Sequence, residues 1–152
     1  MVTTLIVTHG GLAQELLQAA ETIVGKLDTF EVVTLDWSDS FEEALQKTQL
    51  VMDELDDDQE VLILTDMYGG TPYNVAASLI DPGRVELVTG VNLPMVVRLG
   101  CPDTRDKGVA ELAEWIQAKA RTSICRAGER NGNGKESRQE KPASDEPVSC
   151  DD

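Results

Sequence analysis

The chain has 152 residues and a formal net charge of −15 at pH 7, from 28 acidic and 13 basic side chains with the single histidine counted as neutral. Apolar residues make up 41% of the chain, which suffices for one domain with a core of its own. The negative charge repels nucleic acid and anionic membranes, so we expect neither as a partner.

Hydrophobic periodicity alternates along the chain between a strand period and a helix period, with turn residues at each switch. In chain order the pattern predicts a strand over 2–7, a helix over 12–24, a strand over 30–35, a helix from Ser38 or Ser40 to about 55, a strand over 60–65, a short helix over 71–79, a strand over 84–89, a turn over 90–95, a long helix over 106–120 and a short edge strand over 122–125.

This alternation predicts an α/β fold with a doubly wound, mainly parallel sheet, strand order 2-1-3-4 and helices on both faces. The edge strand at 122–125 would be antiparallel to the others. Residues 1–126 form the predicted domain. Residues 127–152 are polar and nearly devoid of apolar side chains, so we expect a disordered tail.

Membrane insertion, secretion and metal binding are not expected. No apolar run approaches the roughly 20 residues of a membrane helix, and no basic stretch precedes an apolar one at the N-terminus. Cys101, Cys125 and Cys150 lie far apart without a C-x-x-C pair, which argues against both a disulfide framework and a zinc site. We therefore expect a cytoplasmic protein without a metal.

Two predicted turns carry residues suited to chemistry. His9, the only histidine, follows the first strand, and Asp66 follows the third. In the order 2-1-3-4 these strands are neighbours at the point where the strand order reverses, which is where ligands collect in such sheets. A carboxylate that accepts the proton of one imidazole nitrogen leaves the other nitrogen nucleophilic, so His9 is the candidate catalytic group and Asp66 its orienting residue.

The turn after Asp66 has the composition of an anion cradle. Gly69 and Gly70 can turn backbone N–H groups inward, and Thr71-Pro72 indicates the start of a helix, whose N-terminus favours an anion. A phosphoryl group arriving at His9 would suit this cradle. Transfer of that group depends on positioning and electrostatics, so no cofactor is expected.

Three loop motifs follow the first, third and fourth strands: Thr8-His9-Gly10, Asp66-x-x-Gly69-Gly70-Thr71-Pro72-x-Asn74 and Gly90-Val91-Asn92-Leu93-Pro94-Met95. Together they resemble the EIIA domain of the mannose family of the bacterial phosphoenolpyruvate-dependent sugar phosphotransferase system. The resemblance spans about residues 1–125. The residues expected to line the site are Thr8, Gly10, Trp37, Tyr68, Asn92 and Pro94.

The resemblance implies a phosphotransferase component. His9 would accept a phosphoryl group from the phosphocarrier HPr and pass it to an EIIB component, for sugar uptake or to regulate a partner protein. We expect EIIB to be a separate protein, because only a polar tail follows the predicted domain, and association with a membrane permease complex stays open. The resemblance also implies a homodimer that exchanges an edge strand, a role for residues 122–125.

Two other classes of protein fit part of the pattern. In a receiver-like signalling domain Asp66 would be the phosphoacceptor, but the turn after the first strand lacks the acidic pair that such domains use to hold Mg²⁺. A nucleotide binder would need G-x-G-x-x-G or a Walker lysine, and neither Gly10-Gly11 nor Gly69-Gly70 supplies one. A binding protein without chemistry would keep its function after His9→Ala.

Overall fold

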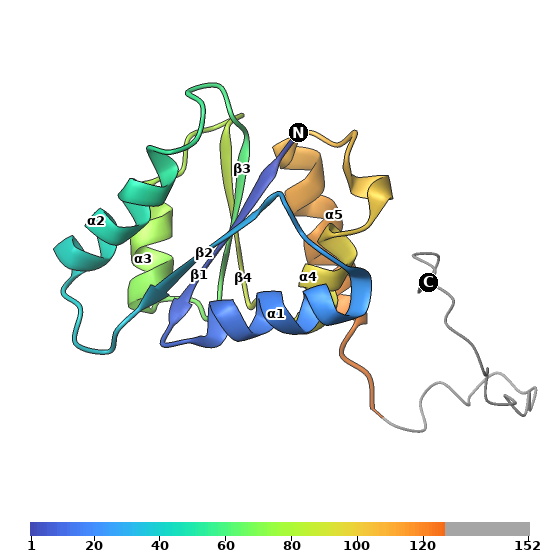
Figure 1. Ribbon diagram of the computed structural model, residues 1–152, viewed down its shortest axis with the longest axis horizontal. Helices are drawn as coiled ribbons and strands as arrows, with labels where there is room; N and C mark the ends of the chain where they lie inside the picture. Colours follow the sequence, from blue (N-terminus) through green and yellow to red (C-terminus); the bar gives the residue numbers. More distant parts are fainter. Residues whose placement is uncertain (127–152) are drawn as a thin grey trace, which may run out of the picture.

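Four apolar runs form a parallel sheet in the order β2-β1-β3-β4, as predicted (Figure 1). The computed structural model describes residues 1–126. Each strand is short and bounded by turn residues, and the two central strands, β1 and β3, are almost wholly buried. The strands are β1 (Thr3–His9), β2 (Phe30–Leu35), β3 (Val61–Thr65) and β4 (Val85–Thr89).

Helices cover both faces of the sheet, which confirms the doubly wound α/β class. In Figure 1, α2 and α3 lie on one face and α1, α4 and α5 on the other. The helices are α1 (Leu12–Val24), α2 (Phe41–Met52), α3 (Thr71–Ser78), α4 (Leu93–Leu99) and α5 (Val109–Thr122), with a short 3-10 helix, η1 (Pro102–Thr104), before α5. In the part of the chain that is described, no helix is long and apolar enough to cross a membrane.

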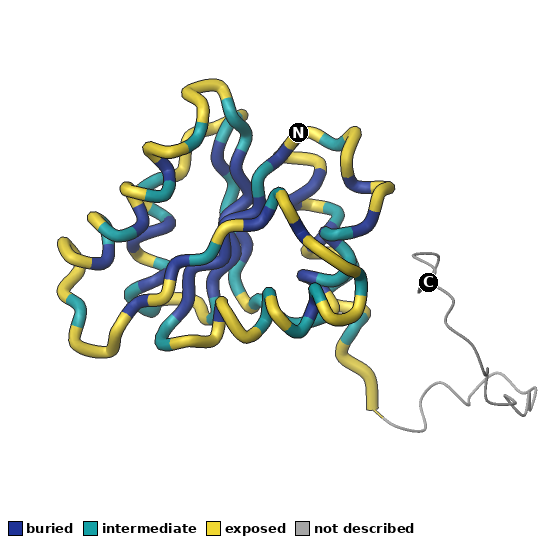
Figure 2. The backbone as a smooth tube through the Cα atoms, viewed as in Figure 1, coloured by how far each residue is buried: buried dark blue, intermediate teal, exposed yellow. Residues whose placement is uncertain are grey.

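The core is divided by the sheet into two layers, because successive strand residues point to opposite faces. Figure 2 shows the buried backbone concentrated in the strands between the helices. Burial of each large aliphatic side chain contributes about 1.5–3 kcal/mol, so the central strands are held firmly. Leu5, Val7 and Ile63 face α2 and α3, whereas Ile6, Leu62 and Leu64 face α1, α4 and α5.

Helix α4 was not predicted from the sequence, where residues 90–95 indicated only a turn. The turn ends at Asn92, whose side-chain oxygen accepts a hydrogen bond from the backbone N–H of Met95 and caps the helix. Pro94 lies in the first turn, where its missing N–H is not needed. With seven residues and two neighbouring valines, α4 is too short for a helical period to stand out.

The edge strand predicted at residues 122–125 is wrong for the single chain that is described. Thr122 ends α5, and its hydroxyl donates to the carbonyl oxygen of Lys119 inside that helix. Ser123 follows as the helix cap, and residues 124–126 are neither helix nor strand. Exchange of this segment between two subunits stays a prediction. The predicted tail, residues 127–152, lies outside the described residues.

A reciprocal pair of hydrogen bonds fixes the start of α2. The Ser40 side-chain oxygen accepts from the backbone N–H of Glu43 at 3.2 Å, and the Glu43 carboxylate accepts from the backbone N–H of Ser40 at 2.8 Å. This capping box satisfies two N–H groups that would otherwise lack partners, and it decides between the two serines predicted as caps.

We expect Ser40→Ala to lower the free energy of unfolding by about 1 kcal/mol, because the N–H of Glu43 loses its acceptor. Urea denaturation followed by circular dichroism measures the change. Ser38→Ala is the control, since Ser38 is exposed and lies outside the helix, and it should change stability by less than about 0.5 kcal/mol. Equal midpoints for the two variants would contradict the capping role.

Candidate functional site

The site lies where β1 and β3 end at the same edge of the sheet. Val7 of β1 pairs with Thr65 of β3, so His9, two residues further on at the end of β1, and Asp66, directly after β3, lie at the same edge of the sheet. From this edge β1 leads to α1 on one face, whereas β3 leads to α3 on the other. The crevice between such diverging connections is the expected binding position in an open α/β sheet.

The carboxylate of Asp66 binds both the side chain and the backbone of His9. Nδ1 of His9 lies 2.7 Å from Oδ2 of Asp66, and the same oxygen accepts the backbone N–H of His9 at 3.1 Å. The other carboxylate oxygen accepts the backbone N–H of Met67 at 2.9 Å. Both side chains are mostly buried, with exposed fractions of 15% for His9 and 14% for Asp66. The carboxylate is therefore anchored on both turns.

This geometry decides which ring nitrogen can react. An ionised carboxylate only accepts hydrogen bonds, so the proton of a neutral His9 ring lies on Nδ1. Nε2 then carries the free electron pair. When Nε2 attacks an electrophile the ring becomes positive, and the carboxylate of Asp66 stabilises that charge.

Gly70 borders the reactive side of the ring. A Cβ atom built on Gly70 would lie 2.8 Å from Cε1 and 3.4 Å from Nε2 of His9, so only glycine leaves the ring room. Gly70 is also the N-cap of α3, whose first turn contains Pro72 and no acidic residue. The positive end of this helix therefore lies beside the reactive nitrogen, where it favours an anion.

The indole of Trp37 covers one face of the imidazole. The two ring centroids are 4.8 Å apart and the planes differ by 15°, which is a stacked arrangement. Trp37 comes from the loop between β2 and α2 and is nevertheless 83% exposed. Its outer face is thus available to a partner while its inner face lies on His9.

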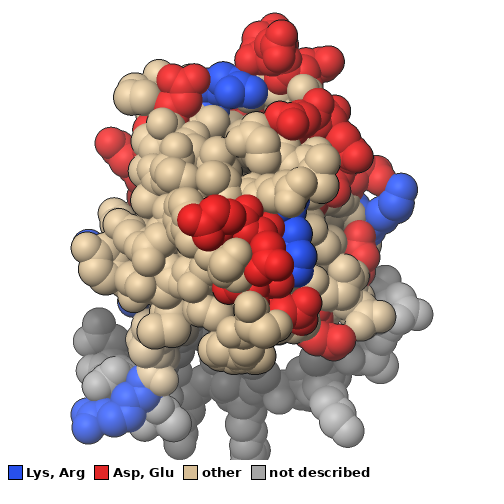
Figure 3. Space-filling view, turned by 90° about the vertical axis from the view of Figure 1, so that its left-hand side faces the viewer, with Lys and Arg blue, Asp and Glu red and all other residues tan. Residues whose placement is uncertain are grey.

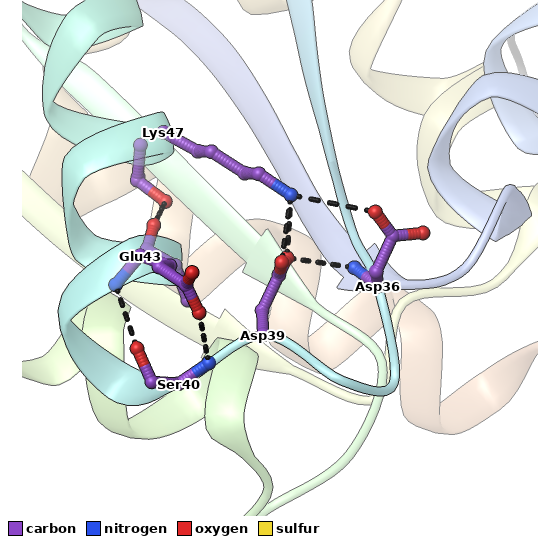
Figure 4. A network of polar contacts seen from close by, with 7 residues as sticks. Asp36, Asp39, Ser40, Glu43 and Lys47 are labelled. Carbon is purple, nitrogen blue, oxygen red and sulfur yellow. Dashed lines mark hydrogen bonds and ion pairs between the residues drawn. The ribbon is translucent and has the colours of Figure 1, made fainter.

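An ion cluster fastens the loop that carries Trp37 (Figure 4). Lys47 of α2 donates to both carboxylate oxygens of Asp39, at 2.6 and 2.9 Å, and lies 3.5 Å from a carboxylate oxygen of Asp36. The Lys47 ammonium holds the pKa of Asp39 below its usual value, and the Asp39 carboxylate raises the pKa of Lys47 in return. The pair is therefore charged at neutral pH.

Comparison with known proteins identifies the family. Residues 3–121 match the model of the EIIA-man family, the PTS system fructose IIA component. The chain belongs to this family. The match covers every described strand and nearly all of the last helix, so the predicted resemblance is confirmed.

Named relatives agree with this assignment. The EIIA chain is 32% identical over 97 residues to the PTS system mannose-specific EIIAB component of Escherichia coli K12, covering 63% of this chain but only 30% of that protein. It is 30% identical over 100 residues to the PTS system fructose-specific EIIA component of Bacillus subtilis, covering 65% of this chain and 68% of that protein. A PTS IIA protein associated with the fucose utilization operon of Streptococcus pneumoniae superposes with a TM-score of 0.72 at 30% identity, over 85% of this chain and 95% of that structure.

Several residues predicted to line the site make other contacts in the structure. Thr8 is fully buried, and its hydroxyl accepts the backbone N–H of Ala13, so it secures the start of α1 and does not face the ring. Asn92 and Pro94 form the start of α4. Tyr68 is 74% exposed and packs on Tyr73, with ring centroids 4.6 Å apart.

The remaining predicted residues, Gly10, Gly69 and Thr71, lie in the segments directly after β1 and β3. Gly10 has a φ of +54°, and a Cβ atom built on it would lie 3.8 Å from Nε1 of Trp37, so the indole passes directly over this turn. Gly69 has a φ of +81°, which favours glycine, and leads into Gly70. Thr71 is the first residue of α3.

The sequence did not point to Lys47 as part of this region. Lys47 lies eight positions after Asp39, on a helix whose amphipathic pattern does not depend on it. The sequence pattern Ser40-x-x-Glu43 predicts that α2 starts at Ser40. Lys47 is then one helical turn after Glu43, on the same side of α2 as the loop acids, and this spacing could have indicated its role. Among residues 1–126 no cluster of metal-binding side chains is present.

We expect Gly70→Ala to displace the imidazole from Asp66, because the new methyl group would overlap Cε1 of His9. The single histidine makes its ring nitrogens directly identifiable by ¹⁵N NMR, and their shifts should move away from those of a ring protonated on Nδ1.

Gly11→Ala is the matched control, since a Cβ atom there meets nothing within 4 Å. Its ring nitrogen shifts should equal those of the unchanged chain. Equal spectra for Gly70→Ala and the unchanged chain would show that Gly70 places no limit on the ring.

Proposed function

We propose that this chain is a phosphoryl carrier of the sugar phosphotransferase system, in which Nε2 of His9 receives the phosphoryl group. The observation that carries the proposal is the 2.7 Å contact between Nδ1 of His9 and Asp66, because it leaves Nε2 as the free nucleophile beside the start of α3. The donor is the phosphohistidine of HPr, and the acceptor is an EIIB component.

The transfer needs no further reactant. The P–N bond to the donor imidazole breaks as the bond between phosphorus and Nε2 of His9 forms, and the donor ring leaves with the electron pair. His9 keeps its proton on Nδ1 and becomes a cation, which Asp66 stabilises. The N–H groups at the start of α3 stabilise the phosphoryl oxygens. Passage to EIIB is the same step in reverse, with another nucleophile.

The contacts of Asp66 favour His9 over Asp66 as the acceptor. Both carboxylate oxygens already accept hydrogen bonds, one from the His9 turn and the other from the N–H of Met67. Phosphorylation of Asp66 would break these contacts and separate the two turns. A receiver-like mechanism would also require a cluster of acids for Mg²⁺, and the described residues contain none.

The surface around His9 suits transient protein partners. Trp37, Met67 and Tyr68 are large side chains that are 83%, 57% and 74% exposed on the loops beside the site. Figure 3 shows acidic side chains gathered over the face on the α2 side, with few lysine or arginine side chains among them. We propose that basic partners are steered to this face and then contact the exposed aromatic side chains.

We expect His9→Gln to abolish phosphorylation of the purified chain by phosphoenolpyruvate, enzyme I and HPr, because the amide offers no nucleophilic nitrogen. The unchanged chain should acquire one phosphate that is labile to acid and stable to alkali, detected by intact-mass spectrometry. An alkali-labile phosphate that persists in His9→Gln would show that Asp66, and not His9, is the phosphoacceptor.

We expect Asp66→Asn to slow phosphorylation by about 100-fold or more, because an amide that donates to Nδ1 places the ring proton on Nε2. Rapid-quench kinetics with phospho-HPr measures the rate. The control is Asp28→Asn, a carboxylate in an exposed pair with Lys26 in the loop before β2, which should transfer at the unchanged rate. Equal rates for the two variants would leave Asp66 as a turn residue only.

A further inference from the structure

The stack of Trp37 on His9 requires an explanation, because the indole is mostly exposed and lies on a loop. A stack with planes 15° apart needs the loop backbone to hold one conformation. The loop is short, running from the end of β2 at Leu35 to the cap of α2 at Ser40. Its conformation must therefore be set by contacts with its ends or with α2.

The loop closes on itself through the backbone and side chain of Asp39. The Asp39 carboxylate accepts the backbone N–H of Asp36 at 2.8 Å, and the backbone N–H of Asp39 donates to the carbonyl oxygen of Asp36 at 3.0 Å. Trp37 and Ser38 lie between these two residues. The turn that presents the indole is thus bracketed by two hydrogen bonds, one of which uses the Asp39 side chain.

Lys47 ties this closed turn to α2, as Figure 4 shows. Its ammonium contacts both oxygens of Asp39 and one oxygen of Asp36. The Asp39 side chain is only 10% exposed, whereas Lys47 is 40% exposed, so the contact is partly shielded from solvent. The capping box between Ser40 and Glu43 sets the first turn of α2 and thereby the place of Lys47.

The other end of the loop is tied to the turn that carries His9. The backbone N–H of Gly10 donates to the carbonyl oxygen of Leu35 at 2.8 Å, and the indole nitrogen passes close to Gly10. The loop is thus held to the His9 turn on one side and to α2 on the other. Trp37 lies between these two attachments, and its indole stacks on the imidazole of His9.

We propose that Lys47 and Asp39 are positioning residues that hold Trp37 over His9, and that Trp37 holds the ring in the orientation required for transfer. The indole closes one face of the imidazole to water and attracts the positive charge that the ring carries once it is phosphorylated. Lys47 acts only through Asp39 and Asp36. The part of this inference that concerns transfer rests on the proposed function, whereas the part that concerns ring placement does not.

The placement is tested on the unphosphorylated chain by proton NMR. The single histidine supplies one pair of carbon-bound ring protons, and a stacked indole shields them and moves their resonances upfield. In Trp37→Leu both resonances should move downfield. In Lys47→Met they should move in the same direction, and in Lys47→Arg they should return toward the unchanged chain, because the guanidinium can still bind both acids.

Two variants separate a local effect from a loss of folding or of surface charge. Lys107→Met removes another lysine that is paired with an acid, Glu111, and should leave the ring protons unshifted. Asp39→Asn should reproduce the shift of Lys47→Met, since it removes the charge at the other end of the contact. Circular dichroism and urea midpoints establish that each variant is folded before its spectrum is compared.

The kinetic consequence is measured with phospho-HPr. Trp37→Leu and Lys47→Met should each accept the phosphoryl group about two- to fivefold more slowly, with Lys47→Arg near the unchanged rate. Ring protons that stay in place in Lys47→Met while they move in Trp37→Leu would overturn the role of Lys47, and ring protons unmoved in Trp37→Leu would overturn the stack. A chain that accepts no phosphate at all would refute the proposed function, while the NMR result still decides the placement.

Discussion

The hydrogen bond between His9 and Asp66 is the contact on which the rest of the site depends. It joins residues 57 positions apart, and it forms because β1 and β3 are adjacent parallel strands that end at one edge of the sheet. Both strands are packed on two faces, so neither turn can shift without disturbing the core. The pairing of the imidazole with Asp66 is thus set by the register of buried strands.

Three different parts of the fold border the ring. Asp66 occupies the Nδ1 edge, Trp37 lies on one face, and Gly70 brings backbone close to Nε2. Because Gly70 is the N-cap of α3, a group bound to Nε2 lies beside the N-terminus of that helix. Catalysis by such a site consists of orientation and charge stabilisation, which fits a group that is passed between proteins.

The motifs that carry the family resemblance and the ion cluster beside Trp37 lie in different loops. The three motifs that carry the family resemblance follow β1, β3 and β4, whereas Trp37 and its ion cluster belong to the loop after β2. In a chain with a net charge of −15, a lysine between two aspartates relieves local repulsion as well as fixing the loop. The loop that carries Trp37 can therefore contain two aspartates and still hold one conformation beside the site.

The sequence alone determined the strands, their order and the pairing of His9 with Asp66, because hydrophobic periodicity identifies buried strands and parallel strands end together. Tertiary structure alone decided that Thr8 secures α1, that α4 exists, that Trp37 stacks on the ring of His9, and that Lys47 binds the acids of the loop carrying Trp37. The reason is physical. Periodicity reports which face of an element is buried, whereas the direction of an exposed side chain depends on partners that come from other elements and leave no regular spacing in the chain.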